Sequence, residues 1–217
     1  MKTLIIIFVV VSTAGLLWGP IMSQVERPKY KVIMSKGSIE VRSYLPTIVA
    51  EVEVDGEREQ AINQGFRLLA DYIFGNNIKK DKIAMTAPVT QQSSQKIAMT
   101  APVTQQVVND KWRVQFIMPS EYTLESLPSP VQPEVLIKKI PAKVYAAIKF
   151  NGNGDNQNIT KHQSQLNKFL TDKKLLSKSE PMYAFYNPPW TLPAFRRNEV
   201  MIEIYNIDSQ VLYNENK

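Results

Sequence analysis

The sequence predicts an α+β fold made of two similar halves, each with one helix. Segments rich in alternating or β-branched residues recur along the chain, and two other stretches have apolar residues at helical spacing. The order strands, helix, strands occurs twice, which favours a pseudo-symmetric sheet with one helix per half. With 217 residues, of which 44% are hydrophobic and 21% charged, the chain is long enough to bury a core.

The individual elements follow from local patterns. Apolar residues recur at helical spacing in residues 57–74, and Gly75 and the asparagines after it favour a stop there. A second helix is predicted at 159–170. The proline-rich stretch 127–133 is predicted to be a loop. Strands are predicted at residues 39–42, 47–54, 112–118, 143–150, 182–186 and 199–205.

An internal repeat occupies the middle of the chain. The eleven residues 82–92 recur without change as residues 96–106, at a period of 14. The copies pair as a hairpin over Ser93-Ser94-Gln95, or one of them is an inserted loop. We favour the hairpin, because isoleucine, threonine and valine suit strands. Pro88 and Pro102 are then expected at an edge, a bulge or a strand end, since proline donates no ladder hydrogen bond.

The N-terminal segment is strongly apolar. No charge occurs between Lys2 and Glu26, and the uncharged stretch 3–24 has 22 residues, against the roughly 20 that span a bilayer. A single basic residue before an apolar run is also typical of a secretion signal, but no A-x-A site follows. We favour an uncleaved anchor over a cleaved signal. Either one predicts an exported protein, membrane-anchored or periplasmic.

Composition excludes several classes of site. The chain has no cysteine, which excludes disulfides, thiolate catalysis and covalent C-x-x-C-H haem attachment. The net charge of +6 and pI of about 9.3 come from basic residues spread along the chain. We therefore predict no nucleic-acid partner and only a general attraction to anions.

Catalytic motifs are absent from the sequence. It has no G-x-S-x-G, no H-E-x-x-H and no phosphate-binding glycine loop. Glu121 and Glu125 are spaced like an acid/base pair, but nearby prolines favour a solvated turn. We predict a binding protein, not an enzyme.

Four segments together resemble the SOUL haem-binding family. They are Ile39-Glu40-Val41-Arg42-Ser43-Tyr44, the repeated Lys-Ile-Ala-Met-Thr-Ala-Pro-Val block, Phe116-Ile117-Met118-Pro119-Ser120 and the proline- and arginine-rich stretch 187–200. The similarity runs in order from about residue 30 to 205. Four blocks in order are far more specific than any single one.

The resemblance implies a distorted antiparallel β-barrel flanked by two helices, with GyrI-like effector-binding architecture. It also implies non-covalent binding of haem or a related porphyrin. We therefore divide the chain into a signal or anchor (1–23), a linker (24–36), a SOUL-like haem-binding domain (37–208) and a polar tail (209–217). Another amphipathic small molecule or lipid is the alternative ligand, and a hydrolase-like role is a minor one, because fold alone does not fix function.

The family's cleft lies between the first helix and the loop before the last strand, here 57–74 and 187–197. In one interpretation, aromatic and apolar residues of the loop cover the porphyrin ring. In the other, the same residues fill gaps in the protein core. The loop arginines pair with a propionate or bond to Glu199 or the barrel backbone. The expected cofactor-binding residues are Asn63, Phe66, Arg67, Ala70, Trp190, Leu192, Phe195, Arg196 and Arg197.

No strong iron ligand is evident. The single histidine, His162, lies in a polar stretch and is expected to be a solvated surface residue. Met85 and Met99 carry thioethers, but methionine in a strand is usually core filler. We therefore expect no protein axial ligand or a weak one, with the affinity coming from burial of the macrocycle.

Overall fold

The structure, a computed structural model, describes residues 25–80 and 94–205. Its elements, in chain order, are β1 (Tyr30–Lys36), β2 (Ile39–Tyr44), β3 (Thr47–Val54), α2 (Arg58–Phe74), β4 (Asn77–Ile78), β5 (Val103–Val108), β6 (Lys111–Ile117), β7 (Ser129–Pro130), β8 (Leu136–Ile140), β9 (Lys143–Phe150), α3 (Asn156–Asp172), β10 (Met182–Phe185), a 3-10 turn (Pro193–Phe195) and β11 (Asn198–Glu203).

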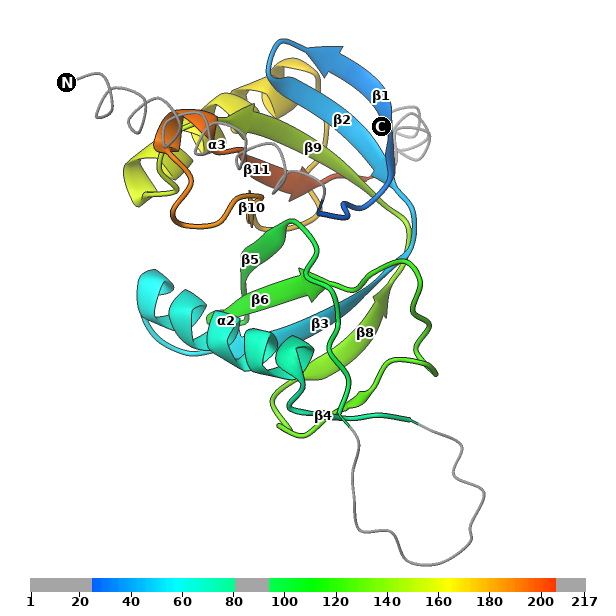
Figure 1. Ribbon diagram of the computed structural model, residues 1–217. Helices are drawn as coiled ribbons and strands as arrows, with labels where there is room; N and C mark the ends of the chain where they lie inside the picture. The colour runs from blue at the N-terminus through cyan, green and yellow to red at the C-terminus, as the bar shows by residue number, and fades with distance from the viewer. Residues whose placement is uncertain (1–24, 81–93, 206–217) are drawn as a thin grey trace, which may run out of the picture.

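One curled antiparallel sheet forms the body of the protein. Nine strands pair in the order β1-β2-β9-β11-β10-β5-β6-β3-β8, and β4 and β7 form a separate ribbon. Figure 1 shows the sheet bending into an open barrel, with α2 outside one half and α3 outside the other. The predicted α+β barrel with two helices is confirmed.

The two halves are repeated units that exchange a strand. Apart from the two-residue strand β4, the order strand, helix, two strands occurs as β3-α2-β5-β6 and again as β9-α3-β10-β11. The strand before each unit pairs with the other unit, since β2 pairs with β9 and β8 pairs with β3. The segments that lead from one half to the other, between β2 and β3 and between β8 and β9, are short, and each contains a proline, Pro46 or Pro141. The halves are therefore interlocked through their backbones.

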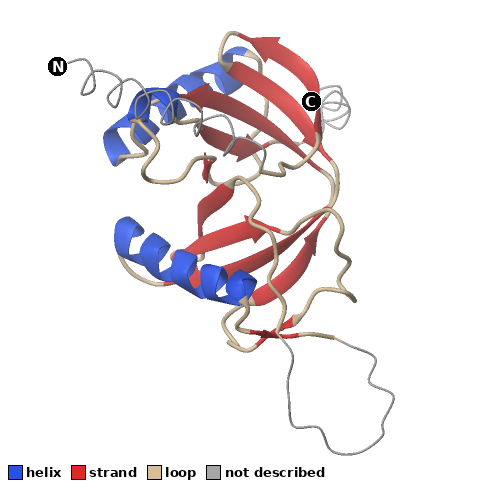
Figure 2. Cartoon of the chain, in the orientation of Figure 1, coloured by secondary structure: helices blue, strands red, loops and turns tan. Residues whose placement is uncertain are grey.

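The side of the sheet that faces the helices is apolar. Val52 and Val114 lie under α2 with Leu69, and Ile148 and Val200 form the equivalent core under α3. The approach of α2 is close, because a Cβ added at Gly65 would lie 2.7 Å from Cγ2 of Val114. Both helices lie on the same outer side of the barrel (Figure 2).

The opposite face of the same strands carries buried polar groups. Residues alternate between the two faces of a strand, so the neighbours of the helix-facing valines point into the barrel. Glu51 and Glu199 are each 1% exposed there, and Arg42 is 2% exposed. The barrel interior is therefore a mixed polar and apolar space.

Two elements differ from the sequence prediction. Residues Tyr30–Lys36, assigned above to a linker, form strand β1, which pairs with β2. Residues Leu136–Ile140, for which no strand was predicted, form β8, which pairs with β3. Both are edge strands with mostly exposed or half-buried residues, so neither carries the apolar alternation that marks a strand.

The predicted hairpin between the two repeat copies is wrong for the second copy. Its first part forms no regular strand, and its last part, Val103 to Gln106, pairs with β6 on one edge and β10 on the other. No edge is left for another strand. Pro102 precedes β5, as expected of a proline at a strand end. The whole first copy, with Pro88, lies outside the described residues.

No helix within residues 25–80 and 94–205 is long and apolar enough to cross a membrane. The segment predicted to be a signal or anchor lies outside these ranges.

Candidate functional site

Three of the four predicted residues on the first helix reach the surface. Asn63 and Arg67 are exposed, Phe66 is 38% exposed, and Ala70 is buried in the core beneath α2. The Phe66 ring contacts that of Phe116 edge-on, at a centroid distance of 5.3 Å, so it both anchors the helix and presents one edge outward. Within the described chain, Arg67 makes no ion pair or side-chain hydrogen bond.

The loop between β10 and β11 exposes three large apolar side chains. Trp190 is 74% exposed, Leu192 66% and Phe195 72%. They therefore do not fill core gaps, which excludes that interpretation of the sequence. Apolar side chains exposed together on one segment are unusual for a monomeric surface and typical of a binding site.

This loop is held firmly although its apolar side chains face outward. The Arg196 guanidinium donates to the carbonyls of Thr191, at 2.7 Å, and Pro189, at 2.5 Å. The Gly152 N–H donates to the Pro193 carbonyl at 2.9 Å. The arginine predicted to bind a propionate thus braces the loop backbone from within.

The contacts of the Arg197 side chain lie in the barrel interior. Its guanidinium donates to Oε1 of Glu199 at 2.7 Å and lies over the Tyr186 ring, 4.1 Å from the centroid. Of the two roles proposed for the arginines, the structure shows the bond to Glu199 for Arg197. Glu199 also accepts from Arg42 and from the Tyr186 hydroxyl, at 2.8 Å each.

These contacts set the charge state of the buried carboxylate. Burial alone would raise the pKa of Glu199, but the hydrogen bonds and charges of Arg42 and Arg197 bring that pKa below its ordinary value. Burial, together with the nearby Glu199 charge, raises the pKa of the Tyr186 phenol. The interior therefore holds an ionised glutamate between two guanidinium groups.

Helix α2 and the loop lie on the same side of the molecule. Figure 1 shows the loop before β11, in orange, facing the N-terminal end of α2. Arg58, in the first turn of α2, donates to the Gly154 carbonyl at 2.7 Å and to the Asn156 side chain at 2.9 Å. Since the adjoining Asn151 and Gly152 hold the loop, the helix and the loop are joined through one turn.

The structure also has a hollow that the sequence pattern does not predict. A solvent-open cavity of about 70 Å³ lies between the two halves, and a groove of about 630 Å³ adjoins it. None of the nine predicted site residues lines either space. Alternation along the strands marks which residues face the barrel interior, but not that space remains between them.

His162 is half-buried, not a solvated surface residue as expected. Its ring stacks on Phe150, with centroids 4.1 Å apart and planes inclined by 11°, and Nδ1 donates to the Asn158 carbonyl at 2.7 Å. Met99 also differs from expectation, since its side chain is 43% exposed and not core filler. Met85 lies outside the described residues. Within the described ranges, no cluster of three or more histidine, aspartate or glutamate residues is placed to hold a metal ion.

Comparison with known proteins defines the class of this barrel. The family model described as SOUL heme-binding protein matches residues 25–95 and 90–203. Heme-binding protein 2 of Homo sapiens is 30% identical over 171 residues, covering 76% of this chain and 78% of that protein. The chain belongs to the SOUL haem-binding family.

Two solved structures share this architecture at low sequence identity. The EcmrR C-terminal domain superposes with a TM-score of 0.56 at 10% identity, covering 82% of this chain and 99% of that one. A hydrolase from Listeria innocua superposes with a TM-score of 0.51 at 14% identity, covering 80% of this chain and 94% of that one. At these identities the likeness shows the fold alone.

Proposed function

We propose that this protein binds haem or a related tetrapyrrole non-covalently on the surface formed by α2 and the loop before β11. The observation that carries the proposal is the exposure of Trp190, Leu192 and Phe195, at 74%, 66% and 72%, on a braced loop. A flat macrocycle needs apolar contact area, and a loop held in advance keeps the ordering cost of binding low. Membership of a family named for haem binding supports the same ligand.

The residues on this surface fit a propionate-bearing ring. Arg67 is exposed and has no partner within the described chain, so it is the guanidinium we assign to a propionate. Arg196 and Arg197 support the site by holding the loop and the barrel beneath it. Phe66, half in the core through Phe116, supplies a fixed aromatic edge.

We assign no strong axial ligand to the iron. His162 is stacked on Phe150 and bonded to its own helix through Nδ1. The Met99 thioether is exposed and is a weak candidate. Affinity then comes from burial of the macrocycle, at about 25 cal/mol for each Å² of apolar surface removed from water. The exposed apolar loop also favours a carrier over an enzyme, and another amphipathic small molecule is the alternative ligand.

The test is a hemin titration followed by the Soret band. Leu192→Glu should weaken hemin binding about tenfold or more, because it removes apolar contact and repels the propionates. Leu45→Glu is the matched control, since Leu45 is 62% exposed but distant from the loop in sequence and lines the groove instead. The control should bind hemin like the unchanged protein. If only Leu45→Glu lost affinity for hemin, the macrocycle would bind at the groove and not at the loop.

We further propose that residues 1–23 direct or anchor the protein to the cell envelope, where it carries or buffers tetrapyrrole. The support is the uncharged apolar run in that segment. Fractionation of cells that express the full chain tests this proposal, and recovery with the cytoplasmic fraction would contradict it.

A further inference from the structure

The interior cavity is lined by both halves of the barrel. Around it lie Tyr44, Val49, Gln115, Tyr145, Met182 and Met201. Tyr145 makes no hydrogen bond through its hydroxyl within the described chain. Its ring meets that of Tyr44 edge-on, at a centroid distance of 5.7 Å. The walls of the cavity are therefore mainly aromatic and apolar.

Two of the polar side chains of the cavity wall, Thr104 and Gln115, are already hydrogen-bonded. Thr104 and Gln115 face each other across β5 and β6, and the Thr104 hydroxyl donates to the Gln115 side chain at 3.2 Å. The Gln115 amide donates to Glu51 at 2.8 Å. At the equivalent place in the other half, Met182 faces Met201. Methionine adapts its shape readily, so the cavity suits an apolar group without a charge of its own.

The outer groove adjoins the cavity, because Pro28, Leu45, Thr47 and Ile117 line both. The groove wall adds three cations, Arg27, Lys29 and Lys139, and two carboxylates, Glu26 and Glu125. Glu26 accepts the Ser120 N–H at 3.0 Å. No ion pair joins the three cations to a carboxylate of the described residues.

We propose that this hollow binds a single-chain fatty carboxylate, with its tail in the cavity and its head group among the cations of the groove. One water-sized group needs about 10–15 Å³, so the cavity of about 70 Å³ has room for about five groups of that size, such as methylenes. It is too small for a macrocycle or for two chains. The remaining methylenes and the carboxylate lie in the groove, where Arg and Lys favour an anion.

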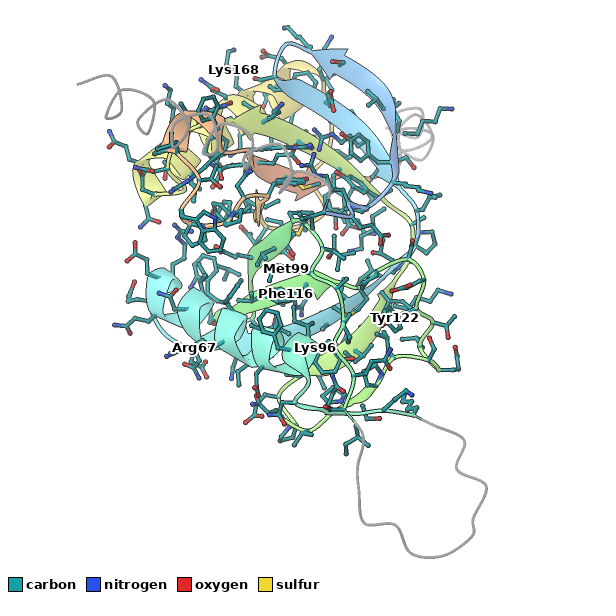
Figure 3. All side chains as sticks on the ribbon, in the orientation of Figure 1. Arg67, Lys96, Met99, Phe116, Tyr122 and Lys168 are labelled. Carbon is teal, nitrogen blue, oxygen red and sulfur yellow. The ribbon has the colours of Figure 1, made fainter. Side chains whose placement is uncertain are left out.

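This site is separate from the tetrapyrrole surface. Tyr122 lines the groove, and Figure 3 places it on the opposite side of the N-terminal half from Arg67. The two sites share no residue. Failure of one proposal therefore leaves the other standing, and the same protein sample tests both.

The test is calorimetric titration of the full chain with a series of straight-chain carboxylates from propanoate to decanoate. Each added methylene should tighten binding about fourfold until the cavity is full, after which the affinity should level off. Decylammonium should bind at least tenfold more weakly than decanoate. Unbroken tightening with chain length, or equal binding of the cation, would overturn the proposal.

Two matched pairs of variants locate the site. Leu45→Glu places an anion at the mouth of the cavity and should weaken decanoate binding about tenfold, whereas Leu192→Glu should not. Lys29→Glu should weaken decanoate but Lys31→Glu should not, since Lys31 lies outside both hollows. These side chains are exposed, so folding is preserved. Unchanged affinity for decanoate in both Leu45→Glu and Lys29→Glu would contradict the proposal. Tighter binding of decyl phosphate than of decanoate would contradict it as well.

Discussion

Arg42 and Glu199 form a two-pronged ion pair inside the barrel, with nitrogen–oxygen distances of 2.8 and 3.1 Å. Arg42 belongs to β2 and Glu199 to β11, so the pair joins the second strand of the chain to the last. The strand β9 lies between them in the sheet. The pair therefore locks the exchanged strand β2 onto the half in which it lies.

Removal of the carboxylate should destabilise the protein. Glu199→Gln leaves Arg42 buried with only Glu40 as a charged partner, at 2.7 Å. Arg197 loses its carboxylate partner as well. Because two partly buried guanidinium groups then share one carboxylate, we expect a loss of about 3 kcal/mol in the free energy of unfolding by urea at pH 7. Glu53→Gln, which breaks an exposed pair with Arg113, should cost less than about 1 kcal/mol. Equal losses in the two variants would contradict the special role of the interior pair.

Acid should remove the contribution of the Glu199 carboxylate to the free energy of unfolding. The pKa of Glu199 is lowered in the folded protein, so its stabilisation is complete above the unfolded value of about 4.3 and is lost as the pH falls through the folded value. The difference in unfolding free energy between the unchanged protein and Glu199→Gln should therefore shrink below about pH 4. Glu203, whose pKa is also lowered, keeps its acid dependence in both proteins. A difference that does not vary with pH would show that the carboxylate charge is not the cause.

The contact between α2 and the sheet depends on Gly65. A methyl group there would lie 2.7 Å from Cγ2 of Val114 and 3.1 Å from Cγ2 of Val52. The overpacking cost of about 1–3 kcal/mol should exceed the helix-propensity gain of about 1 kcal/mol. Gly65→Ala should thus lower the melting temperature, and adding Val114→Ala should partly restore it. A more stable single variant would show that the helix shifts freely.

Helices and strands whose apolar residues follow a single helical or strand periodicity were predicted well from the sequence. Strands β3 and β9 and helix α2 begin and end at or within one residue of the predicted bounds, because each packs one apolar face on a core. Edge strands β1 and β8 lack such a face. The repeat was misjudged because strand propensity does not reveal which neighbour a strand pairs with, and β10 and β6 occupy both edges of β5.

The site was predictable only as a set of residue types. Three apolar side chains in a proline-rich loop are equally consistent with core and with surface, and only the bracing bonds of Arg196 show why they face outward. The pairing of Arg42 with Glu199 spans 157 positions. Local sequence pattern carries no information about such a contact, or about the space left between Gln115 and Met201.

Arg67 should matter for ligand binding and not for folding. Arg67→Ala removes the exposed guanidinium assigned to a propionate, so we expect hemin affinity to fall about threefold to tenfold, with little change in melting temperature. Lys168→Ala on α3 is the control, because its side chain is 77% exposed and Figure 3 places it far from Arg67. Equal hemin affinity in both variants would remove Arg67 from the site.

Arg196 should act through the shape of the loop. Its guanidinium donates to the carbonyls of Thr191 and Pro189 and to the Asn153 side chain, so Arg196→Ala leaves the loop to be ordered by the ligand. Ordering released side chains costs about 0.5–1.5 kcal/mol each, which corresponds to a roughly threefold to tenfold loss of hemin affinity for one or two of them. Cleavage of the loop by a protease should speed up in the same variant and slow again when hemin is added. A loss of affinity without faster cleavage would instead mean that Arg196 contacts the ligand directly.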